Sequence, residues 1–338
     1  ARTDAWMINQ EKFNEAFYAD EIPLANFMKD PFKLAKQGRL DELKKLINQY
    51  VVPMTELLRL EMSQPIPAVM PNTVAGIMRL LDCLFLPYIP DAGAEPDAEK
   101  EAAAKAALPT LIAPFFFFAL TWAVGGTSTQ ASRDKFDTFL KGKIKEVGTK
   151  VGYAPDTSVF DVTYDTATNS WRKWVATIDP YSIPDKCNFQ QDFNSLIVPT
   201  AASICYTNII DTLLKGKKHI LVVGQTGTAK SVVVQQKLTM GLGSKYLGSG
   251  PVPGAEPIMM SFSAQTGANA TQDILDGKFE KRRQGTDKDT GLAYTMWGPM
   301  LGKQFCIFVD DFNMPKRETY GAQPPIELMR QMVDHGGW

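Results

Sequence analysis

The sequence is poor in the residues that build metal centres and disulfide frameworks. Its 338 residues include four cysteines and two histidines, and the cysteines are scattered without a C-x-x-C pair. The histidines, His219 and His335, lie far apart along the chain. This pattern favours a reducing compartment with buried thiols, and it argues against a histidine-based metal centre.

The chain also has no excess of charge of either sign. The formal net charge is −1, 22% of the residues are charged and 44% are apolar, as in ordinary soluble globular proteins. A broad basic surface is therefore not expected, and we predict that the chain binds no nucleic acid. The length of the chain predicts about two domains.

The apolar runs are too short for a membrane protein. The run Leu111–Val124 contains Pro114 and is followed by two glycines, whereas a membrane span needs about 20 mostly apolar residues. We therefore expect a buried core helix here and no membrane association. The polar N-terminal residues predict no signal peptide. The first residue is not methionine and the last residues follow a predicted helix, so the sequence reads as a piece of a longer chain.

Helical periodicity is typical of the first part of the chain, over residues 1–85 and 109–150. Between these stretches, residues 88–108 are rich in Pro, Ala, Asp and Glu, which indicates an exposed loop and a solvated helix. The residue pattern changes over residues 151–190, where Val159–Tyr164 favours a short strand or hairpin.

A helix is predicted next, at the entry to a second region. Thr200 is suited to cap it, and apolar residues recur at i, i+3, i+4, i+7 and i+8 from Tyr206 to Leu214. Strands and helices then alternate from residue 219 onward, which is typical of an α/β fold. The expected strands are 219–223, 257–263 and 305–309. The expected helices are 230–240, 271–282 and 324–334, with a loop over 285–303.

Residues Gly224–Ser231 read Gly-Gln-Thr-Gly-Thr-Ala-Lys-Ser and follow the apolar run His219–Val223 directly. A strand that runs into such a loop predicts a P-loop, whose backbone N–H groups wrap the phosphates of a nucleoside triphosphate. Lys230 would reach the β- and γ-phosphates, and the Ser231 hydroxyl would bind Mg²⁺. The alternative is a Gly/Thr turn after a buried strand.

Ala229 departs from the P-loop pattern, because it stands where the motif has its last glycine. The extra methyl group narrows the room for phosphate and restricts the backbone. Ala-Lys-Ser loops also occur in MCM helicases and in MoxR-type ATPases. The substitution therefore weakens the motif without cancelling it.

A second motif supports a nucleotide site. The continuous apolar run Phe305–Val309 is typical of a strand buried in a parallel sheet, and it ends in Asp310 and Asp311. Asp310 would hold Mg²⁺ through water, and Asp311 stands where many ATPases have a glutamate that polarises the attacking water. Aspartate is one methylene shorter, so hydrolysis is expected to be slow or absent. The alternative is a solvated strand end.

Together these residues resemble the dynein heavy chain family, and the axonemal dyneins more than the cytoplasmic ones. The segments that resemble the Walker B region of the third AAA+ module are Val309–Pro315, Glu318–Leu328 and Asp334–Trp338. Ile197–Thr200 resembles the module entry whose backbone and apolar side chains line the adenine pocket, and Ser261–Thr266 resembles the second strand and the residues after it.

Upstream, Leu120–Gly126 with Arg133 and Phe136 resembles the small helical subdomain of the second module. The resemblance thus implies three parts: residues 1–150 as the helical end of one module, 151–195 as a connector with short strands, and 196–338 as the incomplete start of the next. The implied fold class is α/β, a truncated P-loop AAA+ large subdomain with a parallel sheet and flanking helices, preceded by a mostly helical small subdomain.

The resemblance implies ATP or ADP and Mg²⁺ as ligands of this chain. Lys230, Asp310 and Asp311 would be catalytic, and Ser231 and Asp310 would hold the metal. The nucleotide-binding residues would be Ile197, Val198, Pro199, Thr200, Gly224, Gln225, Thr226, Gly227, Thr228, Ala229, Lys230, Ser231 and Val232.

The implied partners are neighbouring AAA+ modules of the same heavy chain, microtubules through the rest of that chain, and dynein intermediate and light chains. The implied location is the cytoplasm and cytoskeleton, in the axoneme of a cilium or flagellum. In this family the small subdomain can offer an arginine to the nucleotide of its own module, and Arg133 is a candidate. An ordinary surface arginine on a helix is the alternative.

Two functions stay open from the sequence. The site is either an ATPase of the motor ring or a non-hydrolysing regulatory site that locks the ring. A MoxR-type remodelling ATPase and a transporter ATPase are weaker alternatives. The family's sheet has a later strand between the P-loop strand and the Asp310 strand, so residues 196–338 alone are expected not to close their sheet. A cooperative melt of this fragment with ordered near-UV circular dichroism would contradict that expectation.

Overall fold

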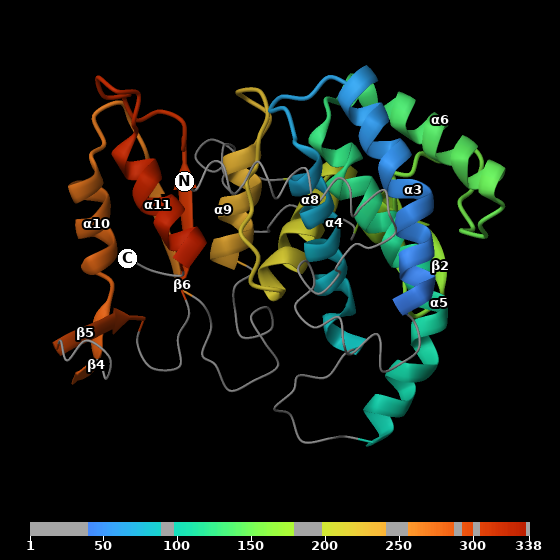
Figure 1. The fold of residues 1–338 in the computed structure, drawn as a ribbon, viewed down its shortest axis with the longest axis horizontal. Helices are drawn as coiled ribbons and strands as arrows, with labels where there is room; N and C mark the ends of the chain where they lie inside the picture. Colours follow the sequence, from blue (N-terminus) through green and yellow to red (C-terminus); the bar gives the residue numbers. More distant parts are fainter. Residues whose placement is uncertain are drawn as a thin grey trace, which may run out of the picture. The chain divides into compact units, whose positions relative to one another are not determined.

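The computed structural model describes residues 40–88, 98–178, 198–240, 256–286, 293–299 and 305–335. The chain forms two compact units, Ala1–Lys218 and His219–Trp338, which we call the helical unit and the nucleotide unit. Each is described by itself. Figure 1 shows their helices and strands coloured along the sequence.

The described part of the helical unit contains five α-helices and a two-stranded hairpin, joined by short 3-10 helices. These elements are α3 (Leu40–Glu61), α4 (Met70–Phe85), η2 (Leu86–Tyr88), α5 (Ala98–Ala123), η3 (Gly125–Thr127), α6 (Gln130–Val147), β1 (Val162–Asp165), β2 (Ser170–Lys173), η4 (Trp174–Thr177) and α8 (Ala201–Lys215). The described part of the nucleotide unit contains α9 (Lys230–Met240), β3 (Glu256–Ser261), α10 (Ala268–Asp276), β4 (Glu280–Thr286), β5 (Ala293–Gly298), β6 (Phe305–Asp310) and α11 (Pro324–His335).

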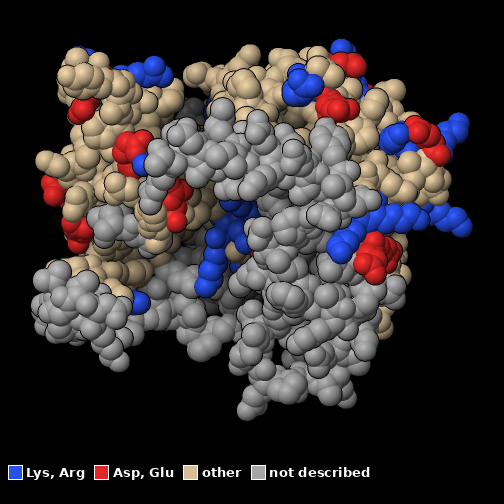
Figure 2. Space-filling model, viewed as in Figure 1, with Lys and Arg blue, Asp and Glu red and all other residues tan. Residues whose placement is uncertain are grey.

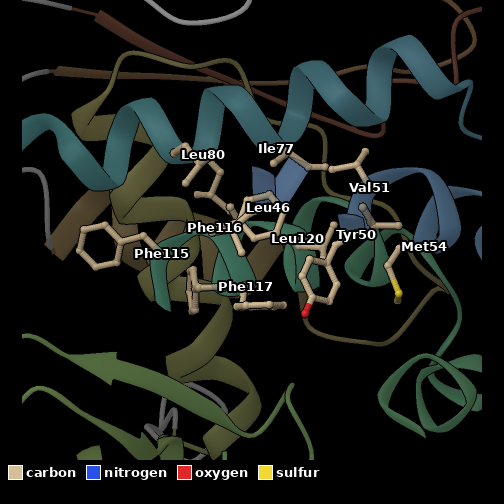
Figure 3. Close-up of a cluster of buried hydrophobic side chains, with 14 of the residues drawn as sticks. Leu46, Tyr50, Val51, Met54, Ile77, Leu80, Phe115, Phe116, Phe117 and Leu120 are labelled. Atoms are coloured by element: carbon tan, nitrogen blue, oxygen red, sulfur yellow. The ribbon is translucent and has the colours of Figure 1, made fainter. Parts of the chain in front are cut away.

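A core of large aromatic and aliphatic side chains holds the helical unit together. Tyr50 of α3 and Phe116 and Phe117 of α5 are fully buried, and the rings of Tyr50 and Phe117 meet edge to face at 4.9 Å. Figure 3 shows these rings among Leu46 of α3 and Ile77 of α4. Burial of such side chains is the main favourable term in folding.

Helix α5 is the element around which this core is built. By length and composition, Ala106–Thr127 meets the criteria for a membrane-spanning helix, but 67% of its apolar window is buried inside the structure. Phe116, Phe117 and Leu120 have no exposed surface. This is the buried core helix that the sequence predicts, and it continues through Pro114.

The region after α6 forms the predicted hairpin. Strands β1 and β2 pair antiparallel, with Tyr164 opposite Trp171. The Trp171 indole N–H donates to the carbonyl of Val151 at 2.7 Å, and its ring packs on Tyr153 at 4.5 Å. Trp174 is 3% exposed. Both tryptophans therefore pack within the helical unit.

Helix α8 begins where the sequence predicts. Thr200 and Ser203 form a reciprocal capping box, in which the Ser203 N–H donates to Thr200 Oγ1 at 3.1 Å and the Thr200 N–H donates to Ser203 Oγ at 2.8 Å. Such a box satisfies backbone donors that the first turn of a helix leaves without partners. Cys205 and Ile210 bury the inner face of the helix.

In the nucleotide unit, β3 and β6 form a parallel pair, with Ile258 opposite Ile307 and Ser261 opposite Asp310. Leu275 of α10 and Met329 of α11 are buried in one cluster with Ile258 of β3. Figure 1 shows α10 in orange and α11 in red near β6. The two strands correspond to the predicted strands near 257–263 and 305–309. This arrangement of helices on a parallel sheet is the predicted α/β class.

Three local predictions differ from the structure. The run His219–Val223 is not a strand, and Leu221, Val222 and Val223 are 66%, 43% and 46% exposed. An extended run becomes a strand only when a neighbour takes its hydrogen bonds, and no described residue pairs with it. Residues 277–282 do not continue α10, and residues 293–298 are not a loop. Instead β4 and β5 pair antiparallel, which hydrophobic periodicity alone does not reveal.

Candidate nucleotide-binding site

The P-loop residues form a tight turn that leads directly into α9. Gly227 and Ala229 have φ values of 80° and 59°, so both lie in the left-handed region. Glycine adopts this region freely, whereas a Cβ atom there meets the following carbonyl. A Cβ atom on Gly224 would lie 3.3 Å from Cδ of Lys230, so the loop also packs closely on its own lysine.

The structure brings the two sequence motifs together at one hydrogen bond. The Ser231 hydroxyl, in the first turn of α9, donates to Oδ1 of Asp310 at 2.8 Å, where β6 ends. The same carboxylate oxygen accepts the backbone N–H of Asp311 at 3.0 Å. A hydroxyl and a carboxylate this close form the type of oxygen pair that hard cations such as Mg²⁺ prefer.

Lys230 is held by its own loop in this structure. Its ammonium group donates to the Gln225 carbonyl, and to Thr228 Oγ1 at 3.2 Å. The Thr228 hydroxyl in turn donates to the Gln225 carbonyl at 2.8 Å. A phosphate that reached Lys230 would therefore replace internal hydrogen bonds with charge-assisted ones. The P-loop motif does not predict that Thr228 links Lys230 to the Gln225 carbonyl. The only sequence signal for this contact is a hydroxyl residue two positions before the lysine.

The backbone conformation of Asp311 is one that aspartate adopts more readily than most residues. Its φ is 51°, its side chain is exposed, and its carbonyl accepts the Met314 N–H at 2.9 Å. Aspartate adopts left-handed conformations several-fold more often than most residues. Ala229 and Asp311, the two departures from the usual motifs, are thus both in the left-handed region. Asn169 and Lys217, which lie outside the two motifs, have the same conformation.

The remaining predicted ligand residues divide between the two units. Val198 is 58% exposed, and with Pro199 and Thr200 it precedes α8 in the helical unit, whereas the P-loop belongs to the nucleotide unit. Ile197 lies outside the described residues. Within the P-loop, Gln225, Thr226 and Thr228 are exposed, as is Val232 in α9.

The charged surface agrees with the near-neutral composition. On the face drawn in Figure 2, basic and acidic side chains are interspersed among other residues.

A glycine-containing turn that leads into a helix, with its serine hydrogen-bonded to the aspartate at the end of a parallel strand, is typical of a P-loop nucleotide-binding module. Residues 185–338 match the family described as the P-loop containing dynein motor region. Residues 43–176 match the dynein heavy chain AAA lid domain. The chain belongs to the dynein heavy chain family.

Individual relatives agree with this assignment. Dynein axonemal heavy chain 1 of Mus musculus is 34% identical over 311 residues, which cover 88% of this chain and 7% of that protein. Dynein axonemal heavy chain 12 of Homo sapiens is 37% identical over 236 residues, covering 66% of this chain and 7% of that protein. The chain thus spans about 7% of the length of these relatives.

Proposed function

We propose that this chain contributes an ATP-binding and ATP-hydrolysing site to the motor ring of an axonemal dynein heavy chain. The observation that supports it most strongly is the 2.8 Å hydrogen bond between Ser231 and Asp310, two motif residues that are 79 positions apart in the sequence. Random surface turns do not align a P-loop hydroxyl with a strand-end carboxylate. The family assignment makes a nucleotide the expected ligand.

Each residue then has a defined task. Lys230 would exchange its bonds within the loop for the β- and γ-phosphates, while Ser231 and Asp310 would hold Mg²⁺ through their oxygens. Asp311 would orient the attacking water and accept its proton. Bound MgATP supplies the transferable phosphoryl group and the cation that balances its charge. An arginine from the next module would complete the site, and this sequence does not contain it.

A regulatory, non-hydrolysing site is the second candidate. Two observations favour it: Ala229 is strained at φ 59°, and the short Asp311 side chain is exposed at φ 51°. The first would hinder placement of the phosphates and the second would hinder activation of the water, so hydrolysis would be inefficient. ATP or ADP would then remain bound and stabilise the module through ligand binding alone.

Beyond the site, we propose that the three parts predicted from the sequence belong to two successive modules of the ring, the second and the third. Nucleotide state would be passed to neighbouring modules of the same heavy chain and would control microtubule attachment elsewhere in it. Intermediate and light chains would be further partners. The location would be the cytoplasm and the axoneme of a cilium or flagellum.

The binding claim is tested by Mg²⁺-dependent ATP affinity in a motor region whose other nucleotide sites are disabled. Ser231→Ala and Asp310→Asn should each lower affinity at least about tenfold in Mg²⁺ and much less in EDTA, since both act through the cation. Ser231→Thr keeps the hydroxyl and should retain affinity. Asp273→Asn, an exposed carboxylate on α10, is the matched control. Equal losses with and without Mg²⁺ would refute the assigned roles.

The two candidate functions are separated by Asp311→Glu. A large rise in turnover at this site would show that the short carboxylate keeps hydrolysis slow. No change in turnover would show that Asp311 takes no part in water activation, and slow turnover would then favour the regulatory site.

A further inference from the structure

The lysine of the P-loop is held by a closed ring of hydrogen bonds within the loop itself. The Lys230 ammonium donates to the Gln225 carbonyl and, at 3.2 Å, to Oγ1 of Thr228. The Thr228 hydroxyl donates to the same Gln225 carbonyl at 2.8 Å. We call this ring the lysine latch. Because each bond polarises the next, a closed ring is stronger than its separate bonds.

The backbone of the loop is shaped so that the latch can close. Gly227 and Ala229, on either side of Thr228, have left-handed backbones with φ values of 80° and 59°. Residues with positive φ build tight turns, and these two bring the Thr228 hydroxyl within hydrogen-bonding distance of the Gln225 carbonyl. All of these residues belong to the nucleotide unit, so the latch is complete within one unit.

The lysine side chain is also packed on the start of the loop. A Cβ atom on Gly224 would lie 3.3 Å from Cδ of Lys230, 3.5 Å from Oγ1 of Thr228 and 3.8 Å from Nζ of Lys230. The outer half of the lysine side chain, from Cδ to Nζ, is therefore folded against the loop beside the Thr228 hydroxyl.

The latch competes with the phosphates of a nucleotide for the lysine. In the proposed site Lys230 reaches both the β- and the γ-phosphate. An ammonium group has few donor protons, and the latch engages those directed at Gln225 and Thr228. Contact with both phosphates therefore requires the latch to open. The apparent affinity for the ligand then falls with the fraction of the protein whose latch is open.

We infer that Thr228 is a positioning residue that regulates the nucleotide site by holding Lys230 in this latch. The inference rests on the proposed nucleotide site, and it adds to that site an internal control of affinity and of binding rate. Because the latch opens before the phosphates reach Lys230, loss of the Thr228 hydroxyl should speed association and leave dissociation unchanged.

The first test needs no nucleotide. Thr228→Val replaces the hydroxyl with a methyl group and keeps the branch at Cβ, so it removes one acceptor of Lys230 with little change of shape. Acetic anhydride at limiting concentration should then acetylate Lys230 about twofold faster or more, relative to the exposed Lys217. Mass spectrometry of the peptides measures this ratio. Thr228→Ser keeps the hydroxyl and should keep the ratio of the unsubstituted protein.

The second test measures binding to a motor region whose other nucleotide sites are disabled, with MgATP and inorganic tripolyphosphate as probes. Thr228→Val should raise the association rate of both probes about threefold and leave their dissociation rates unchanged. Both affinities should rise by the same factor. Tripolyphosphate has no base, so an equal gain for the two probes assigns the effect to the phosphate contacts.

Thr239→Val is the matched control. Its hydroxyl donates to the Gln235 carbonyl at 2.8 Å, at the end of α9 that is far from the loop. The substitution removes the same kind of hydroxyl from the same helix, and it should change neither the acetylation of Lys230 nor the binding of either probe.

Two results would contradict the inference alone. Unchanged acetylation of Lys230 in Thr228→Val would show that the hydroxyl does not hold the lysine. Slower association, or a change confined to dissociation, would show that the hydroxyl serves the bound phosphates instead. An unsubstituted protein that binds neither probe would overturn the proposed function and the regulatory role with it, and the acetylation ratio would still show whether Thr228 holds Lys230.

Discussion

The described parts of the two units differ in the size of their buried hydrophobic cores. In the helical unit, large side chains such as Tyr50, Phe116 and Phe136 are fully buried in one continuous core. In the nucleotide unit, the described core is a small cluster around Ile258 and Phe262, and the apolar run before the P-loop is exposed. Among the described residues, the larger buried core is therefore in the helical unit.

Among the described residues, both units have non-glycine residues in the left-handed region, with Asn169 and Lys217 in the helical unit, but only in the nucleotide unit do such residues lie at the predicted site. Ala229 and Asp311, both in the left-handed region, belong to the nucleotide unit and lie at its two motifs. Regions with few buried contacts open most easily, and ligand-binding loops are commonly drawn from them. The described helical unit thus has the larger core, whereas the nucleotide unit has a P-loop whose lysine is held by internal hydrogen bonds that a ligand can replace.

The largest effect should come from the core of the helical unit. Phe117→Ala removes a fully buried ring that packs edge to face on Tyr50, and it should cost about 3–5 kcal/mol of local stability. Phe139→Ala on α6, where the ring is 40% exposed, is the matched control and should stay within about 0.5 kcal/mol. Hydrogen exchange of α5 and α6 measures both. Similar costs for the two rings would contradict the core as described.

A substitution in the P-loop should change local stability by a smaller amount, and it should stabilise rather than destabilise. Ala229→Gly removes a Cβ atom from a left-handed position and should stabilise the loop by about 1 kcal/mol. Ala270→Gly, on the exposed face of α10, should instead destabilise by about 1 kcal/mol. Hydrogen exchange of residues 224–240 should show the gain in stability of the P-loop, and that of residues 268–276 should show the loss in α10. A destabilising Ala229→Gly would show that the loop is not strained there.

The capping box of α8 should contribute a comparable or smaller amount. Thr200→Ala removes the acceptor of the Ser203 N–H and should cost about 1 kcal/mol in the opening of α8. Thr212→Ala, whose hydroxyl donates to the Asn208 carbonyl of the same helix, should cost about 0.5 kcal/mol or less. Amide exchange of α8 distinguishes the two. Equal costs would mean that the box does not fix the start of the helix.

The smallest effect at neutral pH concerns the buried thiols. Burial raises the pKa of Cys205 in the helical unit to about 12, although the nearby charge of Arg133 lowers it, and burial also raises the pKa of Cys306 in the nucleotide unit. At pH 8 a maleimide should therefore label Cys205 more slowly than Cys306, which is less fully buried. Mass spectrometry of the labelled peptides measures this, and faster labelling of Cys205 would contradict the comparison.

The raised pKa of Cys205 determines how this residue makes stability depend on pH. Because the folded pKa of Cys205 lies above its unfolded value of about 8.5, its contribution is complete below that value. The contribution is lost as the pH rises from there to about 12. The slope of stability with pH should therefore be independent of this thiol near neutral pH, and Cys205→Ala should flatten the alkaline decline.

The sequence predicted those elements whose signals are local. The cap at Thr200, the P-loop turn before α9 and the first turn of α11 at Pro324 each depend on neighbours within a few residues. The apolar run at 305–309 was long enough to indicate β6 without knowledge of its partner. The two motifs predicted that Ser231 and Asp310 would both serve one Mg²⁺ ion, and the direct hydrogen bond between them is seen only in the structure.

The remaining features depend on distant parts of the chain. The run 219–223 is apolar enough for a strand, but whether it becomes one is decided by a neighbour that can accept its hydrogen bonds. Strands β4 and β5 carry no clear alternation, and their pairing of Glu280 with Gly298 defines them. Arg133 packs on two aromatic rings and donates to a tyrosine hydroxyl, and these partners come from three separate segments, so periodicity on its own helix could not reveal them.

The central claim is that the loop around Lys230 holds a nucleotide, and imaging that loop in the intact heavy chain during ATP turnover tests it most directly. We predict nucleotide phosphates against Lys230 and Mg²⁺ between Ser231 and Asp310. ADP there would indicate hydrolysis or direct ADP binding, and persistent ATP would favour the regulatory site. An empty loop at saturating ATP would show that Ala229 has disabled it and would contradict the claim.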